Sequence, residues 1–264
     1  MTLTTTSQPA TPRPASPHRA NPLATATTSV AHAPAAAARV GLVVGATGLV
    51  GQAVLARLLD DKAYSSVHTL GRRAPNVQHP KLVVHLASSL LAFDCPAVDD
   101  VYLALGTTRK TAGSQAAVKA IDLEAVVAVA SAAFQAGATR MAVVSAMGAD
   151  ANSIVFYSQI KGLMEQAVRQ IGFATLVIAR PSLLAGNRDG LQQTARWGEK
   201  LALSAARWLN PLLPVNYRSV DAAQVARAMV DTLQSAGPGQ HVLLSGEIRR
   251  FPVSTTQMDT QIHA

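Results

Sequence analysis

The chain has a single cysteine, few aromatic residues, and no long apolar or basic run. Cys95 stands alone among 264 residues, so an internal disulfide and a cysteine-based metal cluster are both excluded. No uncharged apolar stretch reaches the roughly 18 residues that a membrane-spanning helix needs. The formal charge of +8 is spread over single and paired basic residues, without a basic run interleaved with aromatics. We therefore expect a soluble protein with no bound metal, no membrane span and no dedicated nucleic-acid surface.

Both ends of the chain differ in composition from its middle. Residues 1–38 are mainly Thr, Ala, Pro and Ser with two arginines and no acid. This segment has too little large apolar surface to offset the entropy of ordering, so we predict a disordered extension. The same composition overlaps with that of an organelle transit peptide. A dispensable extension is the interpretation we prefer, and with it a cytoplasmic location. We expect residues 247–264 to form a poorly ordered tail.

A glycine-rich turn between a strand and a helix organises the rest of the chain. The apolar run 40–44 is typical of a buried parallel strand, and an apolar-periodic helix follows over about 50–59. Gly45, Gly48 and Gly51 lie between them at a spacing of three. Glycine permits a tight turn and lets the backbone approach a ligand closely, and the N-terminus of the new helix suits a pyrophosphate. The predicted cofactor contacts in this turn are Gly45, Thr47, Gly48, Leu49 and Val50.

Strands and helices alternate from residue 39 to residue 246. This alternation predicts an α/β fold, a doubly wound parallel sheet of the Rossmann type with right-handed crossovers. A small, mostly helical region at 186–220 would face the substrate. The apolar helix expected at 115–137 makes a homodimer credible. Further strands are expected at 66–70, 81–86, 100–105, 140–145, 174–178 and 241–244, and further helices at 160–171, 191–209 and 221–234.

Two strand ends carry residues suited to a dinucleotide. The strand at 66–70 ends in Arg72 and Arg73, where an acid would favour NADH and arginine favours the 2′-phosphate of NADPH. The strand at 100–105 ends in Gly106, Thr107 and Thr108, at the sheet edge where open α/β proteins bind ligands. We therefore predict NADP(H) as the cofactor.

A tyrosine and a lysine four residues apart are the predicted catalytic pair. Tyr157 and Lys161 fall on one face of the expected helix, and Ser145 lies at the end of the preceding strand. A nearby ammonium favours the phenolate and lowers the tyrosine pKa, which suits proton exchange with a carbonyl or alcohol oxygen. Ser145 could bind the same oxygen and orient it.

At these residues the chain resembles a known family. It is similar to atypical, extended short-chain dehydrogenases/reductases of the NmrA-like kind, and most similar to the Tat-interacting-protein-like oxidoreductases. The matching motifs cover about Val40 to Val242 and are GATGLVG at 45–51, LGRR at 70–73, LGTTR at 105–109, VSAMGAD at 144–150, YSQIKG at 157–162 and ARPSLLAG at 179–186.

The resemblance implies an NADP(H)-dependent oxidoreductase acting on a small carbonyl or alcohol. Tyr157 would be the acid/base, Lys161 would also hold the nicotinamide ribose, Thr107 would line the cleft, and Pro181 and Ser182 would lie near the nicotinamide. Two positions depart from the family pattern. Ala146 follows Ser145 where relatives often have a second hydroxyl, and His85 to Ala87 replaces an acid that contacts adenine. A cofactor-binding regulatory or scaffold protein, and an epimerase or dehydratase with bound cofactor, stay open as alternatives.

Overall fold

A seven-stranded parallel sheet forms the centre of the molecule. The computed structural model describes residues 38–107, 113–185, 216 and 218–252. Within these residues the strand order is β3-β2-β1-β4-β5-β6-β9, and every neighbouring pair is parallel. The strands are β1 (Arg39–Val44), β2 (Tyr64–Gly71), β3 (Leu82–Leu86), β4 (Asp100–Leu103), β5 (Arg140–Val144), β6 (Thr175–Arg180) and β9 (Gly239–Leu244). The short strands β7 (Leu184–Ala185) and β8 (Val220–Asp221) pair separately.

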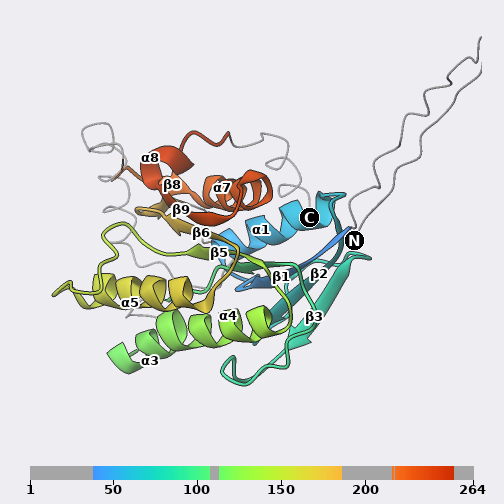
Figure 1. Cartoon of the computed structure of the whole chain (residues 1–264), viewed down its shortest axis with the longest axis horizontal. Helices are drawn as coiled ribbons and strands as arrows, with labels where there is room; N and C mark the ends of the chain where they lie inside the picture. The colour runs from blue at the N-terminus through green and yellow to red at the C-terminus, as the bar shows by residue number, and fades with distance from the viewer. Residues whose placement is uncertain (1–37, 108–112, 186–215, 217, 253–264) are drawn as a thin grey trace, which may run out of the picture. The chain divides into compact units, whose positions relative to one another are not determined.

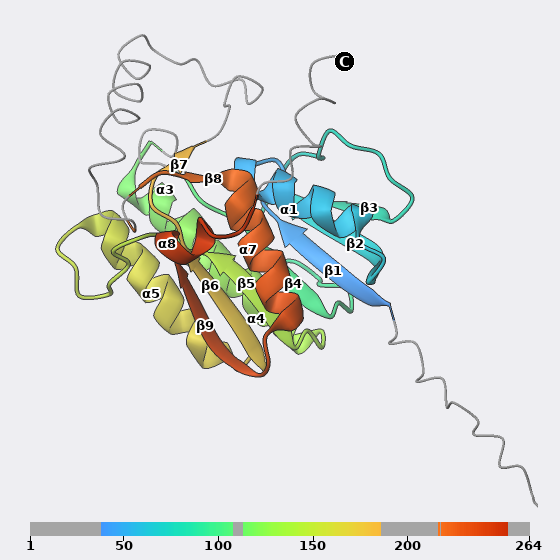
Figure 2. The same ribbon diagram turned by 90° about the horizontal axis from the view of Figure 1, so that it is seen from above.

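Helices cover both faces of the sheet, which confirms the predicted doubly wound α/β class. Figure 1 shows α1 and α7 on one face and α4 and α5 on the other, and Figure 2 shows α7 beside α1 over the strands. The helices are α1 (Leu49–Asp60), α3 (Gln115–Lys119), the π-helical turn η1 (Ala120–Ala125), α4 (Val126–Gln135), α5 (Phe156–Ile171), α7 (Ala222–Ser235) and α8 (Ser245–Ile248).

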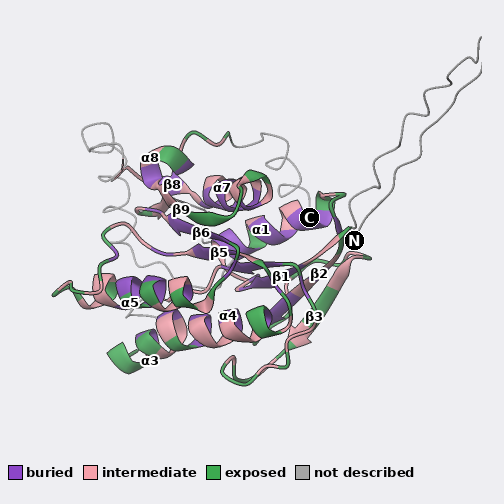
Figure 3. Ribbon diagram, in the orientation of Figure 1, coloured by how far each residue is buried: buried purple, intermediate pink, exposed green. Residues whose placement is uncertain are grey.

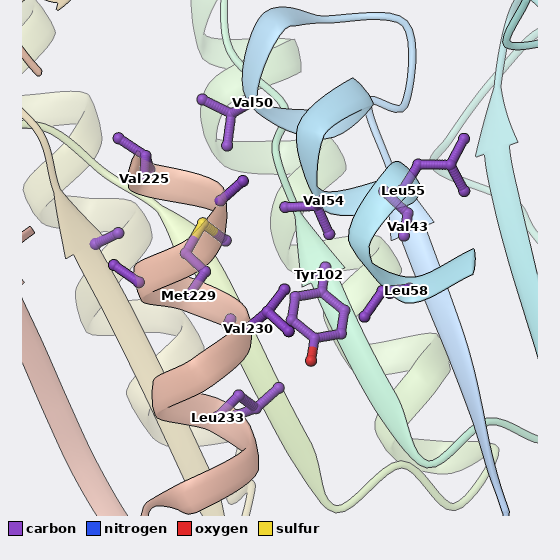
Figure 4. Close-up of a cluster of buried hydrophobic side chains, with 14 of the residues drawn as sticks. Val43, Val50, Val54, Leu55, Leu58, Tyr102, Val225, Met229, Val230 and Leu233 are labelled. Carbon is purple, nitrogen blue, oxygen red and sulfur yellow. The ribbon is translucent and has the colours of Figure 1, made fainter. Parts of the chain in front are cut away.

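Alternate residues of each central strand enter two separate cores. Val43, Tyr102 and Val177 face the core under α1 and α7, part of which is drawn in Figure 4. Their neighbours, such as Leu42 and Leu103, face the core under α4 and α5. Because both faces are covered, the inner strands are buried along their length (Figure 3), which explains their continuous aliphatic sequences.

A polar cluster lies at the amino ends of the strands. Asp100, at the start of β4 and fully buried, accepts hydrogen bonds from the Tyr64 hydroxyl (2.5 Å) and from Arg140 Nε and Nη2 (2.7 and 2.6 Å). The hydroxyls of Tyr64 and Tyr102 lie 2.9 Å apart. We call Asp100, Tyr64, Tyr102 and Arg140 the Asp100 cluster. It ties the starts of β2, β4 and β5 together at the edge of the sheet opposite the glycine turn.

Two predicted elements differ in detail from the structure. The long helix expected at 115–137 is interrupted by η1, and its second half packs on the sheet through Val126 and Val129. Gly137, with φ +103°, then ends this helix as predicted. The tail expected after Gly246 begins with α8, in which Ile248 is buried against α7, because this apolar residue completes the core under that helix. The predicted extension 1–38, all but its last residue, and the helix at 191–209 lie outside the described residues.

Candidate active site

The glycine turn forms a cradle that has no room for side chains. Gly45 has φ +87°, and a Cβ there would lie 2.5 Å from the carbonyl oxygen of Ala104. A Cβ at Gly51 would lie 2.0 Å from the carbonyl oxygen of Gly45, so α1 packs directly on the turn. Gly48 precedes α1, which has no side-chain cap and no acid in its first turn. The N–H groups that begin a helix lack intrahelical partners, so this turn can bind an anion.

The predicted catalytic pair lies on α5, as its four-residue spacing requires. Tyr157 is 41% exposed, whereas Lys161, one turn later, is 1% exposed. Lys161 Nζ lies 5.9 Å from the centre of the Tyr157 ring and 3.4 Å from the carbonyl oxygen of Val144, at the end of β5. Because β1 and β5 run parallel, this pair and the glycine turn occupy the same edge of the sheet.

Asp122 joins these residues to the strand end that carries the predicted threonines. It lies in η1, is fully buried, and places Oδ1 2.7 Å from Lys161 Nζ. Its other oxygen, Oδ2, accepts a hydrogen bond from the Thr107 N–H at 2.9 Å. The contact with Lys161 is an ion pair whose angles are poor for a hydrogen bond, since Oδ1 has no hydrogen-bond partner by geometry.

The pKa of Tyr157 is not lowered as predicted. Burial of the phenol, together with the negative charge of Asp122, raises the pKa of Tyr157 to about 12. The prediction was wrong because it counted the ammonium of Lys161 but neither the burial of the phenol nor the buried carboxylate of Asp122.

Ser145 has a partner that the sequence did not indicate. Its hydroxyl, at the end of β5, is buried and donates to Glu165 Oε1 on α5 at 2.5 Å. Glu165 also accepts from Arg180 Nε and Nη2 at 2.8 and 2.6 Å. With its proton donated to Glu165, Ser145 could only accept a hydrogen bond from a substrate. Its catalytic role stays a prediction.

The remaining predicted cofactor residues lie along the carboxyl edge of the sheet. Arg72 and Arg73 follow β2, are exposed, and make no ion pair or hydrogen bond within the described chain. Gly106 is exposed beside Asp122, while Thr108 lies outside the described residues. Pro181 and Ser182 follow β6. Met147 donates its N–H to the Pro181 carbonyl at 2.9 Å, and the Ser182 hydroxyl donates to the Arg218 carbonyl.

Three residues of this site were missed by the sequence analysis: Asp122, Glu165 and Gly162. Asp122 and Glu165 are charged residues within helices, where an exposed position is the usual expectation. Gly162 follows Lys161 in the YSQIKG motif. A Cβ there would lie 2.1 Å from the Ala151 nitrogen, so this glycine lets the loop after β5 cross α5. A glycine inside an otherwise good helix sequence was the available signal.

Other parts of the described chain offer no competing site of the classes considered. Among the described residues, no group of three or more His, Cys, Asp or Glu could hold a metal ion. No described helix is long and apolar enough to cross a membrane. Burial and Asp94 raise the pKa of the Cys95 thiol to about 11, which makes this thiol a poor nucleophile at neutral pH.

Comparison with known protein families shows which family this chain belongs to. A sequence model of the NAD dependent epimerase/dehydratase family matches residues 41–242, which contain the whole site. The chain belongs to this family. The NAD dependent epimerase/dehydratase family is an enzyme superfamily related to the short-chain dehydrogenases/reductases.

The names of similar curated proteins contradict the cytoplasmic location expected from the sequence. The chain is 33% identical over 204 residues to "Protein FMP52, mitochondrial" of Coccidioides immitis, covering 71% of this chain and 82% of the relative. It is 33% identical over 207 residues to the protein of the same name from Candida albicans, covering 75% and 89%. These names contradict the cytoplasmic location that we expected. The expectation was wrong because a Ser/Thr-rich segment with arginines and no acid fits a transit peptide as well as a dispensable extension.

Solved structures share the fold at low sequence identity. The Bordetella bronchiseptica enzyme WbmH in complex with NAD+ superimposes with a TM-score of 0.60 at 15% identity, covering 79% of this chain and 76% of that one. A short chain dehydrogenase family protein from Francisella tularensis gives a TM-score of 0.61 at 14% identity, covering 80% and 99%. At these identities the likeness shows the Rossmann fold alone.

Proposed function

We propose that the protein is an NADP(H)-dependent oxidoreductase that acts on a small carbonyl or alcohol substrate, with Tyr157 as the acid/base. One observation carries this proposal. A half-exposed tyrosine lies beside a buried lysine at the same sheet edge as a glycine cradle that excludes side chains. Such a phenol can exchange a proton with a substrate oxygen, while its neighbours are held in place by the core.

The residues present fit a dinucleotide. The cradle at Gly45, Gly48 and Gly51 lets a pyrophosphate approach the backbone closely, and the uncapped start of α1 offers its N–H groups and its dipole. Arg72 and Arg73 are exposed and without ion pairs within the described chain, so their guanidinium groups are available to a 2′-phosphate. When bound, the nicotinamide supplies or accepts the hydride. Lys161 and Thr107 are the residues that we propose to hold its ribose side.

Two finer assignments belong to the same proposal. The six quoted motifs support a place among the NmrA-like proteins, close to the Tat-interacting-protein-like oxidoreductases. The names of the curated relatives support a mitochondrial location for this chain. The homodimer expected from the helix at 115–137 also stays a proposal.

A second candidate is an epimerase or dehydratase that keeps its cofactor bound. The family description names this class of reaction and so supports it as an alternative, without favouring it over the oxidoreductase. It would use the same Tyr157 and Lys161, so the site residues do not separate the two reactions. Net oxidation or reduction of a free dinucleotide supports the oxidoreductase, whereas a cofactor that is retained through turnover supports the epimerase.

Equilibrium binding of NADPH and NADH, followed by nicotinamide fluorescence, tests the cofactor assignment. We expect NADPH to bind at least tenfold more tightly than NADH, a difference of about 1.4 kcal/mol. Arg72→Ala combined with Arg73→Ala should remove most of this preference and leave NADH binding unchanged. Equal affinities in the wild-type protein would contradict the assignment to NADP(H).

Tyr157→Phe tests the catalytic assignment. Loss of the hydroxyl should lower turnover by about 10²–10⁴-fold, the usual contribution of a positioned acid/base. NADPH affinity should stay within about twofold, because the ring and Lys161 remain. Turnover equal to that of the wild-type protein would contradict the proposed role.

A further inference from the structure

Exposed apolar side chains flank Tyr157 at the carboxyl edge of the sheet. Ile154 is fully exposed and Val155 is 58% exposed, and both directly precede α5, the helix that carries Tyr157. Leu183, 52% exposed, follows β6, the strand beside β5. A backbone hydrogen bond of 2.9 Å ties the loop after β5 to the loop after β6. We call Ile154, Val155 and Leu183 the apolar rim.

The residues at the start of α5 are poorly suited to helix stability. Val155 occupies the N-cap position, where it makes no side-chain cap and where serine, threonine, aspartate or asparagine is strongly preferred. Ile154, the residue before it, could support the helix by packing on the fourth helical residue, Gln159. Its full exposure rules out such packing. Two apolar side chains are thus exposed to water at the expense of the helix, which is expected where a function needs them.

The segments that carry the apolar rim have no charge of their own, since positions 151–160 and 181–185 contain no charged residue. They therefore offer no cation to a diphosphate or a carboxylate beside Tyr157, as a charged substrate would need. Their apolar surface instead suits a group that gains free energy by leaving water.

The charged groups nearest to the apolar rim are engaged with one another. Lys161 is buried and lies 2.7 Å from Asp122. Arg180 donates two hydrogen bonds to Glu165, which raise the pKa of its guanidinium despite its partial burial. Asp150, on the loop that packs against α5, raises the pKa of Arg180 further and so lies close to that positive charge. The rim is therefore an apolar surface bordered by compensated charges.

We propose that the apolar rim binds the hydrocarbon part of the substrate, so that the protein reduces aldehydes or ketones whose carbonyl group carries an apolar chain. This inference rests on the proposed function and names its substrate class. In the reduction the carbonyl carbon takes a hydride from the reduced dinucleotide, and the carbonyl oxygen takes a proton from Tyr157, which regains one from water. The rim holds the chain beside Tyr157 and contributes binding rather than chemistry.

Saturated aldehydes from butanal to octanal, reduced with NADPH, test this substrate class. Each methylene that leaves water at the rim should raise kcat/KM about two- to fourfold, so octanal should exceed butanal by at least about tenfold. The gain should appear mainly as a lower KM, because the chain contacts the rim equally in the ground state and in the transition state.

Variants of the apolar rim separate binding from structure. Ile154→Ser combined with Val155→Ser should reduce the advantage of octanal over butanal to about threefold or less. Val155→Ser alone gives α5 a better N-cap, so its melting temperature should rise by about 2–4 °C while its preference for octanal falls. A merely structural role would not change the two in opposite directions. Leu91→Ser is the matched control, because Leu91 is also 58% exposed, on the loop after β3, and its variant should keep the wild-type preference for octanal.

A binding measurement tests the apolar rim without turnover. Octanamide should bind the protein saturated with NADPH at least about tenfold more tightly than butanamide, as followed by nicotinamide fluorescence. Equal affinities for the two amides would overturn the inference. So would a double variant, Ile154→Ser with Val155→Ser, that keeps the full preference for octanal. If that variant also lost a dimer seen by sedimentation, the rim would be an interface between two copies of the chain.

Failure of the proposed function would show differently. Absent NADPH binding, or full turnover by Tyr157→Phe, would contradict the oxidoreductase assignment. Reduction of butanal and octanal with equal kcat/KM would leave that assignment standing and overturn only the substrate class. If no aldehyde were reduced, the oxidoreductase would fail, and the comparison of the two amides would still decide whether the rim binds apolar chains.

Discussion

The two edges of the sheet hold buried carboxylates in opposite circumstances. At the amino edge, Asp100 receives hydrogen bonds from Tyr64 and Arg140, all between 2.5 and 2.7 Å. At the carboxyl edge, Asp122 receives one backbone hydrogen bond and an ion pair of poor hydrogen-bond geometry. In the Asp100 cluster the carboxylate and both tyrosines are buried, whereas Tyr157, beside the lysine that pairs with Asp122, is 41% exposed.

The difference shows how a buried charge can serve either stability or chemistry. A fully satisfied network such as the Asp100 cluster fixes the starts of three strands and leaves no bonding capacity for a ligand. The pair of Asp122 and Lys161 is less fully satisfied, because the three protons of Lys161 Nζ face only two oxygens, those of Asp122 and of the Val144 carbonyl. Substitutions at the two edges should therefore separate loss of stability from loss of function.

Asp100→Asn should give the largest loss of stability. It leaves the partly buried Arg140 without its counterion, which typically costs about 3–5 kcal/mol in the free energy of unfolding. Urea denaturation measures this change. Asp99→Asn is the control, because Asp99 is exposed and its side chain can still accept from the Val40 N–H, so the change should stay within about 0.5 kcal/mol. If Asp100→Asn lowered the free energy of unfolding by less than about 1 kcal/mol, the amino edge would not have the stabilising role that distinguishes it from the carboxyl edge.

At the carboxyl edge, Gly51→Ala and Gly48→Ala should differ from each other. The new Cβ at position 51 would lie 2.0 Å from the Gly45 oxygen, so the turn must shift, at about 1–3 kcal/mol in stability and at least tenfold in NADPH affinity. The Cβ at position 48 would meet only that oxygen, at 3.4 Å. It should lower NADPH affinity with little change in stability. Equal stability of the two variants, measured by urea denaturation, would show that the cradle is looser than its geometry indicates.

A smaller effect should appear in alkaline solution. Burial, aided by Asp100, raises the native pKa of Tyr64, and burial, aided by Tyr64, raises that of Tyr102, while both ionise near pH 10 when unfolded. Above about pH 10 the unfolded chain has lost protons that the native chain retains. Stability should then fall with rising pH by about 1.4 kcal/mol per unit for each tyrosine.

Tyr102→Phe should remove one tyrosine's share of this slope, read from unfolding free energies at several pH values. The variant keeps the hydrogen bond from Tyr64 to Asp100, so its stability near neutral pH should change by only about 1 kcal/mol. An unchanged slope would mean that Tyr102 ionises without unfolding, and that the amino edge is less closed than the Asp100 cluster indicates.

Sequence patterns predicted the features that depend on residues close together in the chain. The glycine spacing and the alternating apolar segments indicated the cradle, the parallel sheet and the four-residue pairing of Tyr157 with Lys161. Boundaries were less accurate. The helix expected from Ile160 begins at Phe156, because its first turn has no side-chain cap and is not marked by apolar periodicity.

The features that the sequence did not reveal depend on distant contacts. Asp122 and Lys161 are separated by 39 positions, and no local pattern distinguishes a buried aspartate in a helix from an exposed one. The partner of Ser145 is hidden for the same reason. The sign of the pKa shift at Tyr157 could not be predicted, because it depends first on how far the fold buries the phenol and then on the nearby charge of Asp122.

The direction of the Asp122 side chain depends on the number of residues in the π-helical turn Ala120–Ala125. A π turn closes its hydrogen bonds one residue later than an α turn and so accommodates an extra residue without breaking the helix. Removing one residue from it would regularise the helix and rotate the residues before the deletion by about 100° relative to the residues after it. Asp122 would then leave the ion pair while the sheet stayed intact. A single-codon deletion in this turn could thus change the reaction and preserve the fold.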